Sequence, residues 1–376
     1  MQIGYATTFQ NPHHRHDDKS VVEFEMKNAL LADELGFDSV WATEHHFTDY
    51  EMTPNPLQFL TWVVGASKRL RVGTMVIVLP WHDPVRVAEE IAVLENLSDG
   101  RLILGIGRGL ATVEFDGFRI DMNESRDRFV ESAQVILESL ETGIIKGDGP
   151  HYKIPARALR PVPPYSFVGR SFGAGASPAS MPILAKLGVG FMIIPTKSWA
   201  EIDTDWNAYK AAWAEHQPNR PMQKPLLDQF VIVDRDEGRA REKAERYIRC
   251  YYEEILKHYD MAGDQFKDFK GYEQYAQNAL ELQKNADVVI QRFIDMQAWG
   301  TPEQVIEKLR VVRDHLGMST LMGHFLFGGM PFEESQEHMR LFAEEVMPTL
   351  RSWEPDPYGD RIPSAGACGV VVPEPA

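Results

Sequence analysis

Short apolar runs alternate with longer segments of helical period along the first part of the chain. The apolar runs predict buried strands at residues 2–7, 39–42, 71–79 and 102–106. Apolar positions recurring every three or four residues predict helices at 21–35, 56–67, 84–97 and 123–140. Because this alternation is typical of parallel βα units, we expect four such units here.

The second half of the chain continues the alternation less regularly. Strands are predicted at 167–174, 189–194, 227–234 and 319–327, and helices at 180–187, 199–216, 237–259, 302–315 and 332–350. Residues 260–300 have no clean period, which predicts a long excursion or mobile lid after the seventh strand. The pattern favours an α/β fold, a (β/α)8 TIM barrel with this insertion, formed by residues 1–351 as one domain. Residues 352–376, rich in Pro and Gly, predict a loose, poorly ordered C-terminal tail.

Composition narrows the partners of such a barrel. The 376 residues carry a formal net charge of -16, so we do not expect a nucleic-acid partner, whose phosphates require a basic surface. Cys250 and Cys368 form no disulfide or metal-binding pattern, which favours a reducing, cytoplasmic location. The chain begins on a strand-like segment without a signal peptide, and its longest apolar run is too short for a bilayer. No membrane association is expected.

Two adjacent imidazoles, His45 and His46, directly follow the second predicted strand. The active site of a TIM barrel forms at the carboxyl ends of its strands, and an imidazole titrates near neutral pH. The pair is therefore a candidate for proton transfer or anion stabilisation, although the seven residues around it are equally consistent with a structural role. We expect His45 to face the site and His46 to support the fold or a dimer contact.

A phosphate site is predicted at the neighbouring strand ends. Arg108 lies among glycines after the fourth strand, where a guanidinium could bind a phosphate, and Ser177 and Ser180 lie in a small-residue turn after the fifth. The P-loop and Gly-x-Ser-x-Gly patterns are absent. A further group, His13, His14 and His16, lies in a polar loop and is interpreted as a solvated turn, so no metal site is expected.

Collinear motifs along residues 1–350 resemble those of the bacterial luciferase-like flavin monooxygenases, in a layout close to the luciferase α subunit. The matching segments are 36–41, 44–48, 72–80, 84–86, 105–110, 121–126, 300–303 and 346–348. The resemblance implies a two-component, FMNH2-dependent monooxygenase whose FMNH2 comes from a separate flavin reductase. Such an enzyme reacts FMNH2 with O2 to a flavin C4a-(hydro)peroxide and oxygenates a small apolar organic substrate of the terpene, ketone or aldehyde type.

The resemblance also implies roles for individual residues. His45 matches the catalytic histidine of the family, and a homodimer through the helices after the second and third strands is implied. Cofactor-binding positions fall on the segment that lies against the isoalloxazine, where the family has a non-proline cis peptide, and on the phosphate contacts: Thr74, Met75, Val76, Arg108, Ser177 and Ser180.

The chain departs from luciferase in two places, and two other functions stay open. Gly107 replaces a reactive cysteine, so no thiol takes part in the mechanism and we expect extra space near the flavin. Residues 161–175 do not align, which leaves the substrate wall undefined and makes light emission from an aldehyde doubtful. The alternatives are a deazaflavin-dependent oxidoreductase that transfers hydride and a non-catalytic flavin-binding homologue.

Overall fold

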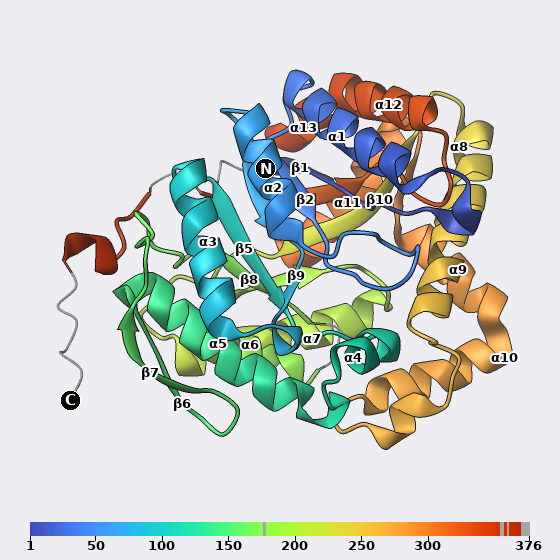
Figure 1. Ribbon diagram of the computed structural model, residues 1–376. Helices are drawn as coiled ribbons and strands as arrows, with labels where there is room; N and C mark the ends of the chain where they lie inside the picture. The colour runs from blue at the N-terminus through green and yellow to red at the C-terminus, as the bar shows by residue number, and fades with distance from the viewer. Residues whose placement is uncertain (176–177, 354–356, 359–360, 370–376) are drawn as a thin grey trace.

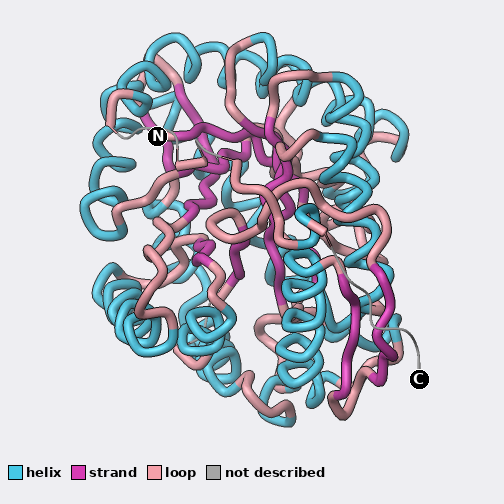
Figure 2. The backbone as a smooth tube through the Cα atoms, turned by 90° about the vertical axis from the view of Figure 1, so that its left-hand side faces the viewer, coloured by secondary structure: helices cyan, strands magenta, loops and turns pink. Residues whose placement is uncertain are grey.

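A computed structural model describes residues 1–175, 178–353, 357–358 and 361–369. In this part of the chain, eight parallel strands close into a barrel that helices surround (Figures 1 and 2). The strand order is β1, β2, β3, β5, β8, β9, β10, β12, and β12 pairs with β1 to close the barrel. The predicted TIM barrel is confirmed.

The barrel strands are short and mostly buried. They are β1 (Gln2–Ala6), β2 (Ser39–Ala42), β3 (Arg71–Thr74), β5 (Leu102–Gly107), β8 (Ser171–Ala174), β9 (Gly190–Ile193), β10 (Leu226–Val233) and β12 (Thr320–His324). The strand predicted at 71–79 is divided into β3 and β4 (Ile77–Val78). The peptide bond between Met75 and Val76, which lie between the two strands, is cis. Both pieces pair with β5, so the division leaves the barrel wall continuous.

The predicted helices form on the outside of the barrel. They are α1 (Asp18–Glu34), α2 (Pro56–Ala66), α3 (Pro84–Ser98), α5 (Ser125–Thr142), α6 (Ser180–Leu187), α7 (Trp199–His216), α11 (Pro302–Leu316) and α12 (Phe332–Leu341), which leads into α13 (Met347–Arg351). Polar side chains define several starts: Asn55, Asp83 and Thr301 each accept a backbone N–H of the first turn. The helix predicted at 237–259 is present as α8 (Glu237–Lys243) and α9 (Arg249–His258), joined by a π-helical turn.

Five helices and strands were missed by the sequence prediction. They are α4 (Thr112–Phe118), the antiparallel hairpin β6 (Ile144–Asp148) and β7 (Lys153–Ala158), α10 (Glu273–Met296) and β11 (Ala298–Gly300). The excursion at 260–300 is therefore largely helical, because α10 alone spans 24 residues. The backbone of α10 leaves helical geometry at Asn285, where φ is -142° and ψ is 44°. The sequence prediction of a segment without a helical period was wrong for residues 273–296, which form this helix.

One large side chain fills the barrel interior below the carboxyl ends of the strands. Trp41 on β2 is fully buried, and its indole N–H donates to Ser39 Oγ at 2.8 Å. The flanking strands carry Gly4 and Gly73, where a Cβ atom would lie 2.4 and 2.1 Å from the indole. The tryptophan fits only because both neighbours lack side chains.

The described part of the tail packs against the barrel. Ser364 is fully buried, and its hydroxyl donates to the carbonyl of Pro163 at 2.6 Å. The ring of Tyr358 lies 6.4 Å from that of Phe172, and its hydroxyl lies 3.3 Å from Thr320 Oγ1 at the start of β12. These described residues are attached more closely than the sequence predicted, while the domain boundary at 351 stays a prediction. No helix in the described ranges has the length and hydropathy needed to cross a bilayer.

Candidate active site

His45 lies in the loop after β2, at the carboxyl ends of the barrel strands. Its Nδ1 atom is 3.1 Å from Glu114 Oε1, and its Nε2 atom is 3.3 Å from the hydroxyl of Tyr259. Glu51 Oε2 lies 3.9 Å from the same Nε2 atom. The imidazole side chain is only 15% exposed. His45 is thus held at both nitrogens, with one edge accessible, as a proton-transfer group requires.

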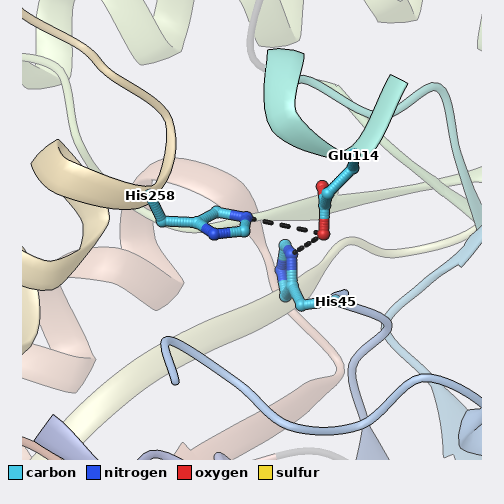
Figure 3. Close-up of side chains that lie close together, drawn as sticks. All are labelled: His45, Glu114 and His258. Carbon is cyan, nitrogen blue, oxygen red and sulfur yellow. Dashed lines mark hydrogen bonds and ion pairs between the residues drawn. The ribbon is translucent and has the colours of Figure 1, made fainter. Parts of the chain in front are cut away.

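Glu114 connects three segments that are distant in the sequence. It belongs to α4, and its Oε1 atom accepts the backbone N–H of His46 at 2.8 Å as well as facing His45. His258, the last residue of α9, places its Nε2 atom 3.4 Å from the same oxygen (Figure 3). The Glu114 side chain has no exposed surface. A single buried carboxylate therefore lies between two imidazoles.

The charges of this cluster favour a proton on His45. Burial by itself would lower the pKa of His45, but the ion pair with Glu114 and the nearby carboxyl of Glu51 raise it above its ordinary value. Burial likewise acts against the charge on Glu114, yet His45 and His258 lower its pKa to about 2. Burial lowers the pKa of His258 despite its contact with Glu114. Glu114 thus stabilises an imidazolium at His45, whereas burial favours a neutral imidazole at His258.

His46 faces a separate carboxylate. Its Nε2 atom lies 3.1 Å from Glu44 Oε1, which also contacts Nε2 of His82 at 2.6 Å. The other oxygen of Glu44 accepts the backbone N–H of Val78 at 2.8 Å. These bonds fasten the loop after β2 to the start of the next βα loop. The two adjacent histidines therefore have different partners, and the contacts of His46 are structural.

Two arginines converge next to the carboxyl end of β5. Arg108 Nη1 and Arg126 Nη2 both donate to the carbonyl oxygen of Gly271, at 3.2 and 3.3 Å. The Arg108 guanidinium lies over the ring of Tyr272, 3.9 Å from its centroid. Each guanidinium has five N–H donors, so one shared carbonyl leaves donors for an anionic ligand. Two cations side by side also favour a ligand with more than one negative charge.

Of the two predicted serines, Ser180 follows β8, the neighbouring strand of the barrel. Since β5 and β8 pair in parallel, the turn after β8 meets the same edge as Arg108. Ser180 begins α6 after this turn and is half-buried. Ser177 lies outside the described residues.

The third-strand segment is engaged mostly by its own neighbours. Thr74 Oγ1 donates to the carbonyl of Gly105 and accepts its N–H, both at 2.8 Å, so the hydroxyl is committed to β5. The Met75–Val76 peptide is cis, at the position that the resemblance implied. A Cβ atom at Gly107 would lie 2.3 Å from Val76 Cγ2. The expectation of extra space at Gly107 was therefore wrong, because Val76 fills it.

Sequence reasoning missed four residues of this site. Glu114 comes from a short helix that was not predicted, and His258 and Tyr259 come from the end of a helix whose polar face gave no hint of a buried contact. Arg126 lies in a segment that matched the family pattern, and its charge was the one available signal.

A (β/α)8 barrel with a buried imidazole–carboxylate pair and two converging arginines at its strand ends is an enzyme scaffold suited to acid/base chemistry beside an anionic ligand. The chain belongs to the luciferase-like monooxygenase family, whose model matches residues 1–320. It is 29% identical over 360 residues to an alkanal monooxygenase alpha chain of Photorhabdus luminescens, covering 93% of this chain and 97% of that one. The protein is therefore an oxidoreductase of the flavin monooxygenase kind.

Solved structures with this fold bind different flavin cofactors. The monooxygenase RslO1 of Streptomyces bottropensis is 26% identical, with a TM-score of 0.72 over 93% of this chain and 100% of its own. The oxygenating constituent of 3,6-diketocamphane monooxygenase of Pseudomonas putida, a Baeyer-Villiger enzyme in complex with FMN, shares the fold at 17% identity, with a TM-score of 0.73 over 93% and 98% of the two chains. An F420-dependent secondary alcohol dehydrogenase shares it at 17% identity, with a TM-score of 0.67 over 93% and 99%.

Proposed function

We propose that the protein is the oxygenase component of a two-component monooxygenase. It takes FMNH2 from a separate flavin reductase and uses O2 to oxygenate a small apolar organic substrate of the terpene, ketone or aldehyde type. The observation that carries this proposal is the ion pair of His45 and Glu114 at the carboxyl ends of the strands of a barrel from the flavin monooxygenase family. The FMN complex of the 3,6-diketocamphane enzyme, which has the same fold, supports the choice of FMN.

The residues at the strand ends fit a flavin phosphate. FMN ends in a phosphate monoester, and the paired guanidinium groups of Arg108 and Arg126 match its charge and its several acceptor oxygens. Ser180 at the start of α6, and Ser177 before it, are proposed to add hydroxyl contacts. This cationic pair is notable in a chain of net charge -16, because few other features of so acidic a protein attract an anion.

Once bound, reduced flavin would supply the electrons that activate O2. The chain's own contribution is to hold a proton and to exclude water. Because Nδ1 of His45 is occupied by Glu114, a proton would be exchanged through Nε2, the atom that faces the Tyr259 hydroxyl. Tyr259 contacts His45, and Tyr272 in the excursion that follows lies against Arg108, so both side chains limit the access of water to this side of the barrel.

The decisive experiment measures where the oxygen atom goes. The chelator-treated protein is titrated anaerobically with FMNH2, and 18O2 is then admitted with a cyclic ketone, a monoterpene or a long-chain aldehyde. We expect tight FMNH2 binding and one 18O atom in the product of at least one substrate. Substrate turnover with a reduced deazaflavin and no uptake of O2 would contradict the proposal and support the hydride-transfer alternative, which the F420-dependent enzyme of the same fold makes a real competitor.

We further propose a homodimer formed through α2 and α3. Two large apolar side chains on α3 are unusually exposed, Val93 at 45% and Leu97 at 56%. Sedimentation velocity is expected to give the mass of two chains, and Leu97→Glu is expected to shift the protein toward the monomer. A wild-type mass of 42.7 kDa would refute the dimer. The reductase partner and a cytoplasmic location stay predictions.

A further inference from the structure

We propose that His45, Glu114 and His258 form a binding site for one divalent transition-metal ion, with Zn2+ as the ion expected to bind. One nitrogen of each imidazole and one carboxylate oxygen lie within 4.8 Å of one another, and all three side chains point toward a common centre (Figure 3). They come from the loop after β2, from α4 and from α9. No sequence motif joins them, which is why no metal site was predicted.

The spacing of the ligand atoms suits a tetrahedral ion. Zn2+ binds nitrogen and oxygen at about 2.0–2.1 Å, so neighbouring ligands of a tetrahedral site lie about 3.3–3.4 Å apart. Glu114 Oε1 lies 3.1 Å from His45 Nδ1 and 3.4 Å from His258 Nε2. The two imidazole nitrogens lie within 4.8 Å of each other, so the three ligand atoms could reach this spacing through movements of their side chains.

Unsatisfied polar atoms provide an independent sign of a missing ligand. His258 Nε2 and Glu114 Oε2 are buried and have no hydrogen-bond partner among the described residues. Buried polar atoms are nearly always paired with protein, water or an ion, because an unpaired one costs about 1–3 kcal/mol. The 3.4 Å approach of His258 to Glu114 thus brings two groups together without a hydrogen bond. A cation bound between Glu114 and His258 would provide the partner that His258 Nε2 lacks.

The outer nitrogens of both imidazoles already have partners. His258 Nδ1 is 2.7 Å from Thr48 Oγ1, and His45 Nε2 is 3.3 Å from the Tyr259 hydroxyl. Metal-binding histidines typically use the second nitrogen in this way, which fixes the ring and directs the first nitrogen at the ion. In this site the inward nitrogens are the two that face Glu114.

The charge and chemistry of the cluster select the kind of ion. Glu51 Oε2 is buried without a hydrogen bond among the described residues, 3.9 Å from His45 Nε2, so a second carboxyl group lies beside the site. Two carboxylates can balance a divalent cation. Two imidazole ligands favour Zn2+ over Mg2+ or Ca2+, which prefer oxygen.

Metal binding would have a consequence for the proposed function. The ion would occupy Nδ1 of His45 and tie the base of the excursion at His258 to α4. If His45 transfers protons as proposed above, the metal-loaded protein is inactive and Zn2+ acts as an inhibitor, because an imidazole with a cation on Nδ1 no longer gains and loses a proton at Nε2 near neutral pH. This consequence rests on the proposed function, whereas the binding site does not.

The test measures Zn2+ alone on untagged, chelator-treated protein without flavin. Isothermal titration is expected to give one tight equivalent per chain, and Co2+ is expected to give the intense visible bands of a tetrahedral complex. His258→Gln is expected to weaken Zn2+ at least about 100-fold, since loss of an outer partner alone weakens metal binding about 10- to 100-fold. His82→Gln is the matched control: His82 and His46 also contact one buried glutamate, Glu44, but among the described residues this trio does not bring its ligand atoms within 4.8 Å of one another, so the variant should leave affinity unchanged.

Three results would overturn the metal site. They are the absence of a tight equivalent, unchanged affinity in a folded His258→Gln protein, and loss of the tight equivalent on replacing the exposed group His13, His14 and His16 by Gln instead. Circular dichroism and FMNH2 binding verify that each variant is folded. No Zn2+ binding together with full FMNH2-dependent oxygenation would reject only the metal site. Bound Zn2+ that leaves oxygenation unaffected would uphold the site and reject the role of His45.

Discussion

Replacing Glu114 by Gln removes one negative charge from the candidate site with almost no change in volume. The amide oxygen can still accept the backbone N–H of His46, which lies 2.8 Å from Oε1 in the wild type. It cannot form an ion pair with His45. We therefore expect Glu114→Gln to lower the pKa of His45 toward its ordinary value and to destabilise the folded protein.

The loss of stability follows from the pKa of Glu114. Burial opposes ionisation of this carboxyl, yet His45 and His258 lower its pKa from 4.5 to about 2. The difference, 4.5 minus 2, corresponds to about 3 kcal/mol at about 1.4 kcal/mol per pKa unit. Because the folded-state pKa lies below the unfolded value, this stabilisation is fully present above pH 4.5 and is lost as the pH falls toward 2. Linkage leaves about 1.4 kcal/mol near pH 3.

Urea unfolding, followed by tryptophan fluorescence at pH 7 and pH 3, measures this difference. Glu334→Gln is the control, because the nearby imidazole of His338 and the contacts of Tyr247 and Lys243 offset burial and lower the pKa of Glu334 to about 2, while none of these residues contacts His45. The control is expected to lose stability without losing oxygenation, whereas Glu114→Gln loses both. A Glu114→Gln protein as stable as the wild type at pH 7, or a difference that grows toward pH 3, would refute the reasoning.

Further predictions concern the flavin and the packing of the barrel. His45→Ala is expected to bind FMNH2 normally but to release its reducing equivalents as H2O2 instead of product, which a peroxide assay measures. Arg108→Ala is expected to weaken FMNH2 binding by about 1.5–3 kcal/mol, or about 10- to 150-fold, and unchanged affinity would remove the phosphate assignment. Arg126→Ala is expected to behave similarly, and a double-mutant cycle tests whether the two bind one group. Gly107→Ala is expected to destabilise by about 1–3 kcal/mol, because its Cβ would lie 2.3 Å from a side chain of the adjacent strand. Gly65→Ala in α2, with nothing within 4 Å, should instead stabilise by about 1 kcal/mol in the same urea assay.

The barrel could be predicted because its strands are short apolar runs and its helices have apolar positions every three or four residues, and the two kinds of segment alternate along the chain. The run at 71–79 shows the limit of that pattern, since Met75 and Val76, which separate β3 from β4, are apolar like β4 and give no signal of the division. Helix α10 shows another limit. Its buried apolar positions, which include Ala279, Leu282, Ile290 and Phe293, share one helical face, but polar residues between them hid this period in the sequence.

A residue of the site could be predicted only where its type and its position after a strand were enough to identify it. His45 and Arg108 follow strands and have side chains whose chemistry stands out. Glu114, by contrast, gains its importance from contacts with residues on two other segments, and only the folded chain brings these together. The error at Gly107 has the same origin. A missing side chain becomes empty space only if no neighbour fills it, and here Val76 does.

The excursion at 260–300 connects the two halves of the proposed site. Tyr259, directly before it, contacts His45, and Tyr272 within it lies under Arg108 and donates its hydroxyl to the carbonyl of Gly109. A movement of this segment away from the barrel would therefore remove a partner from the acid/base group and from the phosphate group together. Binding of a phosphate at the arginines would, by the same contacts, favour the arrangement in which His45 is held. The excursion is for this reason better described as a wall of the site shared by the acid/base group His45 and the phosphate-binding group Arg108 than as a lid over one of them.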